Sequence, residues 1–223
     1  MGKMIELTAS DGHKLSAYRA DPAQKPRGAI VVIQEIFGVN SHIKSVADGY
    51  AADGYVAIAP ALFDRVKKGV DLGYSPDDIA KGREVRGKVT NDMAMKDVAA
   101  AVKAASSAGK VGIVGYCWGG LVAWLASEQV PGLSAAAPYY GGGMPDNANV
   151  KPKVPVMAHF GAKDAHIPVE GVKKLAAAHP KDQFFIYDEA DHGFNCDQRG
   201  SYNAGAAKQA RQRTLEFFRK NVG

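Results

Sequence analysis

Residues 111–120, VGIVGYCWGG, decide the fold of this 223-residue chain. A short apolar run ends in a turn with a glycine two positions before Cys117 and another two positions after it. The same spacing, G-x-S-x-G, occurs where a strand turns so sharply into a helix that the central residue is held under backbone strain. An apolar run at 121–126 follows and has the character of a helix. We therefore predict a strand, a tight turn and a helix, with Cys117 at the apex.

Cys117 is a candidate nucleophile in this setting. A thiol at a helix N-terminus lies near the positive end of the helix dipole, which favours the thiolate. Most single cysteines are small buried core residues, but the flanking glycines, the preceding strand and the following helix favour a functional thiol here. Glycines also cradle phosphates, yet neither G-x-G-x-x-G nor G-x-x-x-x-G-K-[ST] fits this spacing. A nucleotide-binding loop is therefore excluded.

The segments around this turn supply further strands. Residues 5–8 and 15–19 alternate in type and are joined by Asp11 and Gly12, which predicts an antiparallel hairpin. The later apolar runs are short, as in strands buried on both faces of a parallel sheet. The predicted strands of this second kind are 28–33, 55–60, 110–114, 133–140, 154–160 and 183–188.

Helical spacing separates most of these strands. Ser41 is a suitable N-cap for a helix that reaches about residue 52, and residues 61–75 have the character of a long loop. The remaining predicted helices are two segments within 76–105, then 169–178 and 202–221. An antiparallel start followed by alternating strands and helices predicts a mostly parallel sheet with helices on both faces.

Length and composition favour one domain and a small-molecule partner. With 46% hydrophobic and 23% charged residues, the chain fits a single α/β domain over residues 1–223. The net charge of +5 comes from 28 basic and 23 acidic residues that are dispersed, so we expect no nucleic-acid partner. The assembly expected is a monomer or a small homo-oligomer.

The sequence also bears on location and cofactors. The N-terminal residues lack the apolar core of a signal peptide, and no apolar run is long enough to cross a membrane. Two cysteines do not make a disulfide framework. We therefore predict a cytoplasmic protein with no membrane partner. No C-x-x-C or H-E-x-x-H spacing is present, so neither a metal nor another cofactor is expected.

A thiol nucleophile for acyl transfer needs a histidine base that is itself oriented by an acid. Of the six histidines, His13 and His42 lie upstream of the nucleophile and His179 ends a helix before a proline. His159 lies inside a predicted strand and is interpreted as a core residue. His166 and His192 remain, and we favour His192 because it follows a strand in a loop with glycine freedom. Asp164 follows the preceding strand and suits the acid, while Asp191 stays open as a rival.

Several motifs together resemble the dienelactone hydrolase (carboxymethylenebutenolidase) family. They are QEIFGVN at 34–40, GYCWGG at 115–120, YYG at 139–141, Gly161-x-x-Asp164 and HGF at 192–194. The resemblance extends from about residue 5 to the C-terminus. It implies an α/β-hydrolase fold, a catalytic triad of Cys117, Asp164 and His192, and an oxyanion hole formed by the backbone N–H groups of Ile36 and Trp118. It also implies that Glu35 neighbours the thiol and helps to form the thiolate when substrate arrives.

The family's substrate is a lactone that bears a carboxylate held by arginines. The best-known members have an arginine four residues after the histidine, where this chain has Cys196. Arg83 and Arg199 are the candidates here, and the resemblance also indicates Phe37 and Tyr140 as substrate contacts. Cys196 is interpreted as a loop thiol without a role.

We expect a hydrolase that opens a small carboxylated enol-lactone or a related ester through an acyl-enzyme on Cys117. One alternative is a general carboxylesterase or thioesterase with the same triad. The other is a non-hydrolytic thiol protein that senses oxidants.

Overall fold

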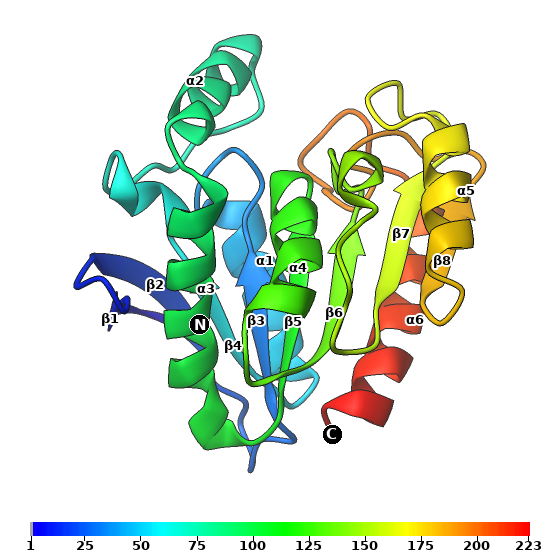
Figure 1. Cartoon of the computed structure of the whole chain (residues 1–223). Helices are drawn as coiled ribbons and strands as arrows, with labels where there is room; N and C mark the ends of the chain where they lie inside the picture. Colours follow the sequence, from blue (N-terminus) through cyan, green and yellow to red (C-terminus); the bar gives the residue numbers. More distant parts are fainter. Residues whose placement is uncertain (1) are drawn as a thin grey trace.

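The computed structural model describes residues 2–223. An eight-stranded sheet forms its centre, in the order β1-β2-β4-β3-β5-β6-β7-β8 (Figure 1). The first two strands are the predicted antiparallel hairpin, β2 pairs antiparallel with β4, and the pairs from β4 to β8 are all parallel. The strands are β1 (Lys3–Thr8), β2 (Lys14–Ala20), β3 (Ala29–Ile33), β4 (Val56–Pro60), β5 (Val111–Tyr116), β6 (Leu133–Tyr139), β7 (Met157–Gly161) and β8 (Gln183–Tyr187).

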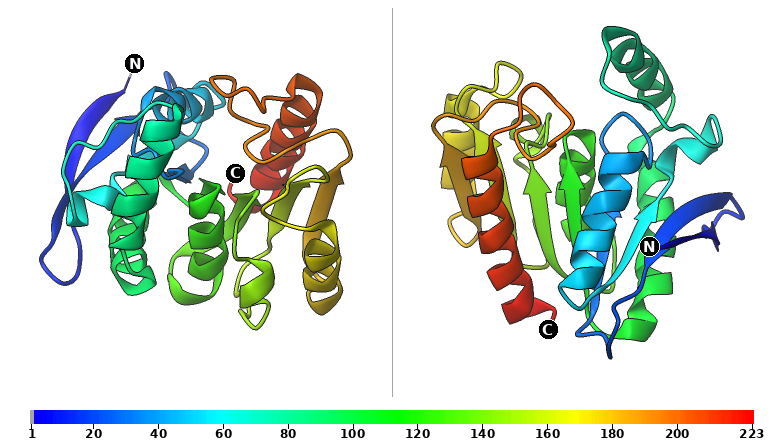
Figure 2. Two further views of the ribbon diagram at one scale, coloured as in Figure 1. Left: turned by 90° about the horizontal axis from the view of Figure 1, so that it is seen from above. Right: turned by 180° about the vertical axis from the view of Figure 1, so that it is seen from behind.

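Helices cover both faces of the sheet, as the alternation predicts. Figure 2 shows α3, α4 and α5 in a row on one face, and α1 and α6 on the other. Because both faces are covered, every residue of β3, β4 and β5 is buried. The helices are α1 (Ser41–Ala52), α2 (Pro76–Gly87), α3 (Asn91–Ala105), α4 (Trp118–Gln129), α5 (Val169–Ala178) and α6 (Ala204–Asn221), with short 3₁₀ turns η1 (Leu62–Arg65), η2 (Ser106–Ala108) and η3 (Pro145–Asn147).

Two local expectations need correction. The N-cap of α1 is Asn40 rather than Ser41: the extended backbone of Asn40 lets its side chain accept from the N–H of Ile43 at 3.2 Å, whereas Ser41 is already helical. The predicted loop at 61–75 also contains η1, whose Leu62 and Phe63 are buried. Both differences arise from contacts that the local pattern does not encode.

The carboxyl ends of the parallel strands meet at one edge of the sheet. β3, β5, β7 and β8 end there at Ile33, Tyr116, Gly161 and Tyr187, each a few residues before a predicted site residue. In open parallel sheets, ligands bind at this edge. α2 lies beyond the same edge, at the top of Figure 1. None of the helices within residues 2–223 is both long and apolar enough to cross a membrane.

Candidate active site

Cys117 occupies the sharp turn that the glycine spacing predicts. Its backbone has φ 56° and ψ −118°, a strained conformation for a residue other than glycine. A Cβ on Gly115 would lie 1.9 Å from the carbonyl oxygen of Gly119, and one on Gly119 would lie 2.4 Å from that of Gln34. Only glycine fits at these two positions. The turn therefore presents the half-buried thiol at the start of α4.

His192 and Asp164 lie in line behind the thiol. His192 Nε2 is 3.1 Å from Cys117 Sγ, and His192 Nδ1 is 2.7 Å from Asp164 Oδ2. The other oxygen of Asp164 accepts from the backbone N–H groups of His166 at 2.8 Å and Ile167 at 3.2 Å. These bonds hold a fully buried carboxylate side chain in a fixed orientation. The arrangement can hold His192 in one tautomer and move a proton between Nε2 and the thiol.

The hydrogen bonds in this line of contacts favour a protonated His192 and an ionised Asp164. Burial opposes the imidazolium form of His192, but hydrogen bonds to Asp164 and Cys117 outweigh it and raise the His192 pKa to about 10. Burial of Asp164 is likewise outweighed by its hydrogen bond with His192, and the net effect lowers the Asp164 pKa. A protonated His192 beside the thiol is the partner that a thiolate needs.

The rival residues take other positions. Asp191 accepts from the backbone N–H of His192 at 2.6 Å and does not contact the ring. His159 is a core residue, as interpreted from its place in a strand. Its ring nitrogens lie 3.0 Å from the hydroxyls of Tyr187 and Thr214, and burial lowers its pKa to about 3. His166 lies beside the site, with its ring centroid 5.6 Å from that of His192.

Two backbone N–H groups near the thiol are free to bind an oxyanion. Within residues 2–223, neither the N–H of Ile36, in the loop after β3, nor that of Trp118, the first residue of α4, donates a hydrogen bond. One donor following the nucleophile and one from the loop after an early strand is the usual composition of an oxyanion hole in such folds.

The thiol opens into a cavity of about 280 Å³. Three of the four predicted substrate contacts line it, because the loop after β3, helix α2 and the loop after β8 meet above the sheet edge. Its wall is formed by Ile36, Phe37, Ile79, Arg83, Cys117, Gly142, His166, His192 and Arg199. Arg83 is exposed and makes no ion pair among the described residues.

Comparison with known proteins gives the family. Residues 15–222 match the sequence profile of the dienelactone hydrolase family. The chain belongs to this family. A Synechocystis sp. protein provisionally named carboxymethylenebutenolidase is 36% identical, with 94% of this chain and 93% of the relative covered. A Pseudomonas putida protein named carboxymethylenebutenolidase is 34% identical, covering 96% and 94%.

Solved structures agree with the family and with the fold. A provisionally named dienelactone hydrolase from Klebsiella pneumoniae superposes with a TM-score of 0.84 at 32% identity, covering 97% of this chain and 98% of that one. The predicted α/β-hydrolase fold is thus confirmed, and as a dienelactone hydrolase family member the protein is a carboxylic ester hydrolase.

Glu35 forms an ion pair with Arg199. The family resemblance predicts this glutamate beside the thiol. Its side chain is 1% exposed, and Oε1 accepts from Arg199 at 3.0 Å. Oε2 is buried and has no hydrogen-bond partner within residues 2–223. No hydrogen bond joins Glu35 to Cys117 in the same residues. Arg199 therefore links this carboxylate to the cavity wall.

Tyr140 is the one expected substrate contact that the cavity wall lacks. It is fully buried, with its ring centroid 5.3 Å from that of His192, so it packs against the histidine and has no surface open to a ligand. Its backbone N–H donates to the carbonyl of His159 at 2.7 Å. In this structure Tyr140 lies behind His192 rather than in the cavity wall, and its contact with substrate stays a prediction.

The sequence reasoning missed three parts of the cavity wall, which are Ile79, Gly142 and His166. Ile79 stands four positions before Arg83 on α2, and residues at this spacing share a helix face. The position of Arg83 in a predicted helix therefore indicates that Ile79 faces the same cavity. Gly142 directly follows the YYG motif, and His166 lies two residues after Asp164 and was weighed above only as a base, so neither was predicted to line a cavity.

One group of side chains outside the Cys117 contacts has the composition of a metal site. Glu35, His42 and Cys196 are all buried, and one ligand atom from each lies within 4.8 Å of the others. Burial is the main reason that the pKa of His42 is lowered, so its imidazole is neutral at pH 7. The metal-binding spacings considered in the sequence do not include this group, because Cys196 is far along the chain from Glu35 and His42.

Proposed function

We propose that the protein opens a small enol-lactone bearing a carboxylate by forming an acyl-enzyme on Cys117. The observation that carries the proposal is the continuous line of contacts from Cys117 Sγ through His192 to Asp164, which opens into a cavity walled by two arginines. A thiol, a base and an orienting acid are the groups that acyl transfer needs. The motifs of the family support the same assignment.

In the first half of the reaction, the Cys117 thiolate attacks the lactone carbonyl and forms a C–S bond. The carbonyl oxygen becomes an oxyanion bound by the N–H groups of Ile36 and Trp118. When this intermediate collapses, the ring C–O bond breaks, and the enolate leaving group takes a proton from the imidazolium of His192.

In the second half, His192 takes a proton from water as the water attacks the thioester. The new oxyanion occupies the same two N–H groups, and its collapse releases the carboxylic acid product and the thiolate. His192 keeps the proton, so the thiolate and the imidazolium that began the reaction are regenerated. Asp164 stays ionised throughout and orients the ring.

Arg199 and Arg83 are proposed to bind the substrate carboxylate. The planar guanidinium can hold both carboxylate oxygens. A substrate carboxylate that binds Arg199 competes with Glu35 for the same cation. Release of Glu35 from Arg199 is how we expect substrate to bring this carboxylate toward the thiol and promote its ionisation.

The second candidate function is hydrolysis of neutral esters or thioesters with the same residues. The apolar part of the cavity wall, formed by Ile36, Phe37 and Ile79, favours this reading because it would accept an uncharged acyl chain. The two candidates differ only in whether the arginines contribute to substrate choice.

A panel of lactones and p-nitrophenyl esters, tested on the wild type and on Cys117→Ala, tests the proposal. We expect the wild type to prefer carboxylated lactones and Cys117→Ala to lose turnover of every substrate, because the change removes the one sulfur that carries the acyl group. Equal rates on neutral and carboxylated substrates would select the second function. Undiminished turnover by Cys117→Ala would exclude both.

A further inference from the structure

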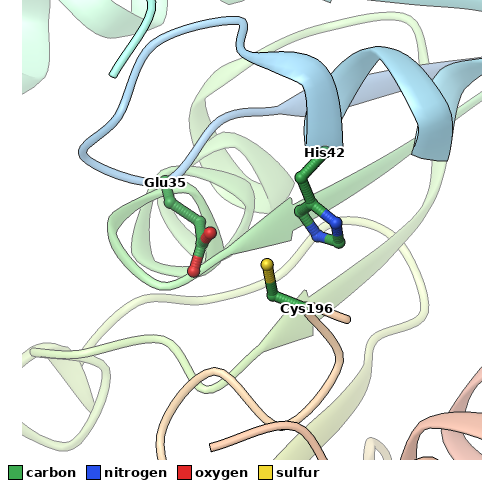
Figure 3. A group of neighbouring side chains, drawn as sticks. All are labelled: Glu35, His42 and Cys196. Atoms are coloured by element: carbon green, nitrogen blue, oxygen red, sulfur yellow. The ribbon is translucent and has the colours of Figure 1, made fainter. Parts of the chain in front are cut away.

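A second group of reactive side chains lies beside the catalytic contacts. Glu35 comes from the loop after β3, His42 from the first turn of α1, and Cys196 from the loop after β8. Figure 3 shows the three side chains converging, with the sulfur of Cys196 between the carboxylate and the imidazole. One ligand atom from each lies within 4.8 Å of the others.

Two atoms in this group are buried without a partner. Glu35 is 1% exposed and His42 is 4% exposed. Glu35 Oε2 and His42 Nε2 have no hydrogen bond within residues 2–223. A buried polar atom without a partner costs roughly 1–3 kcal/mol, so two of them beside a buried thiol indicate a ligand that binds them.

The other nitrogen of His42 has the partner that a metal-binding histidine usually has. His42 Nδ1 lies 3.5 Å from Asp197 Oδ1. Histidines that bind metals commonly donate this second N–H to a carboxylate, which fixes the tautomer and leaves the opposite nitrogen free to bind the ion. Asp197 therefore sets Nε2 as the nitrogen available to a ligand.

We propose that Glu35, His42 and Cys196 bind a divalent transition-metal ion of the zinc class. A thiolate, an imidazole and a carboxylate are ligands that Zn²⁺ prefers, and three protein ligands leave a fourth position for water. Tetrahedral bonds of about 2.0–2.3 Å separate ligand atoms by about 3.3–3.8 Å. Because the ligand atoms lie within 4.8 Å of one another, the side chains need to close by no more than about 1.5 Å. Binding displaces the thiol proton of Cys196 to solvent.

A second cavity reaches His42, and Cys117 is not among the residues that line it. His42 and Asp197 line a cavity of about 300 Å³ between α1 and α6. The side chain of Asp197 is 67% exposed, which places a carboxylate within reach of solvent. Lys208 and Arg211 also line this cavity; Lys208 is exposed, and Arg211 is paired with Asp53. A hydrated cation can reach His42 without passing the catalytic thiol.

Metal binding at this group would also affect hydrolysis, and this consequence rests on the proposed function. Glu35 is shared between Arg199 and the proposed ion. An ion bound to Glu35 holds the carboxylate away from the thiol, so we expect the metal-loaded protein to hydrolyse lactones more slowly. Removing the ion with a chelator should restore the rate.

The primary test measures binding rather than activity. Untagged protein is freed of metal by chelator dialysis and titrated with Co²⁺, whose thiolate charge-transfer and visible bands report a sulfur ligand. We expect one Co²⁺ per chain, displaced by Zn²⁺. The bands should disappear in Cys196→Ser and persist in the matched control Cys117→Ser, while His42→Gln should weaken binding at least 100-fold.

Asp197→Asn provides a second variant that leaves the buried residues intact. Loss of an outer carboxylate typically lowers metal affinity about 10–100-fold, and we expect a loss in that range here. The site is overturned if the folded wild type shows no thiolate band, or if the bands follow Cys117 instead of Cys196. Unchanged affinity in both Asp197→Asn and His42→Gln would also overturn it. Absence of hydrolysis with intact Co²⁺ binding would contradict the proposed function alone.

Discussion

The two cysteines lie at the same edge of the sheet in opposite environments. Cys117 is half-buried at a helix N-terminus, 3.1 Å from His192, and opens into the cavity. Cys196 is fully buried, and burial together with the nearby charge of Glu35 raises its pKa to about 11. The residue type is the same, so the difference lies in the neighbours: a histidine base and an open cavity for one thiol, burial and an anion for the other.

Removing the base should make Cys117 chemically similar to Cys196. We expect His192→Ala and Asp164→Asn each to lower kcat by about 10³–10⁴, by analogy with serine triads. Because the members act as a unit, the double variant should be little slower than the slower single variant. Steady-state kinetics of the three proteins check this, and additive losses would contradict one of the two assignments.

The arginines distinguish the cavity of Cys117 from the closed surroundings of Cys196. Arg199→Ala should lower kcat/KM for a carboxylated lactone. The corresponding loss of transition-state stabilisation should be about 2–5 kcal/mol, the range for removing one partner of a buried charge pair. Arg83→Ala should show a smaller loss, because Arg83 is exposed. p-Nitrophenyl acetate is the control, since it has no carboxylate. An equal loss on both substrates would indicate structural damage instead.

The titration of His192 should report its contact with Cys117. Imidazole NMR should show His192 protonated at pH 8, with a midpoint near pH 10. The folded pKa is raised above the ordinary 6.5, so this interaction stabilises the fold fully below pH 6.5 and the stabilisation is lost as the pH rises to about 10. Removing Cys117 or Asp164 should lower the midpoint. A wild-type midpoint near 6.5 would contradict the stabilisation of protonated His192 by Asp164 and Cys117.

Replacing the second thiol should have the smallest effect. In metal-free buffer, Cys196→Ala should lower kcat/KM less than tenfold, because Cys196 does not line the cavity. The small void left in the interior should lower the free energy of unfolding by about 1 kcal/mol, as measured by urea denaturation. A loss of activity as large as that of Cys117→Ala would erase the contrast between the two thiols.

Much of the fold was predictable because its signals are local. The glycines around Cys117, the alternating hairpin and the short apolar strands each specify a structure through backbone sterics or burial. The meeting of Asp164 and His192 near Cys117 was also predictable, because each follows a parallel strand and parallel strands bring their carboxyl ends to one edge. The sequence also distinguishes His159 from His192, because His159 falls inside a predicted buried strand and His192 falls in a loop.

The remaining parts depend on how loops cross in space. Ser41 and Asn40 are both good N-caps, and only the backbone conformation of Asn40 decides between them. Tyr140 is fully buried against His192, which the sequence does not indicate. Glu35, His42 and Cys196 come from three loops and helix ends, so no spacing within any one segment predicts that they meet.

The central claim is that Cys117, and not Cys196, carries the acyl group. Rapid-quench intact-mass analysis with p-nitrophenyl acetate, followed by peptide mapping, tests it directly. We predict a transient single acetyl group on the peptide that contains Cys117, with Cys196 unmodified. Turnover without any acetyl group on Cys117, or a thiol that gains only oxygen or a mixed disulfide, would contradict the claim.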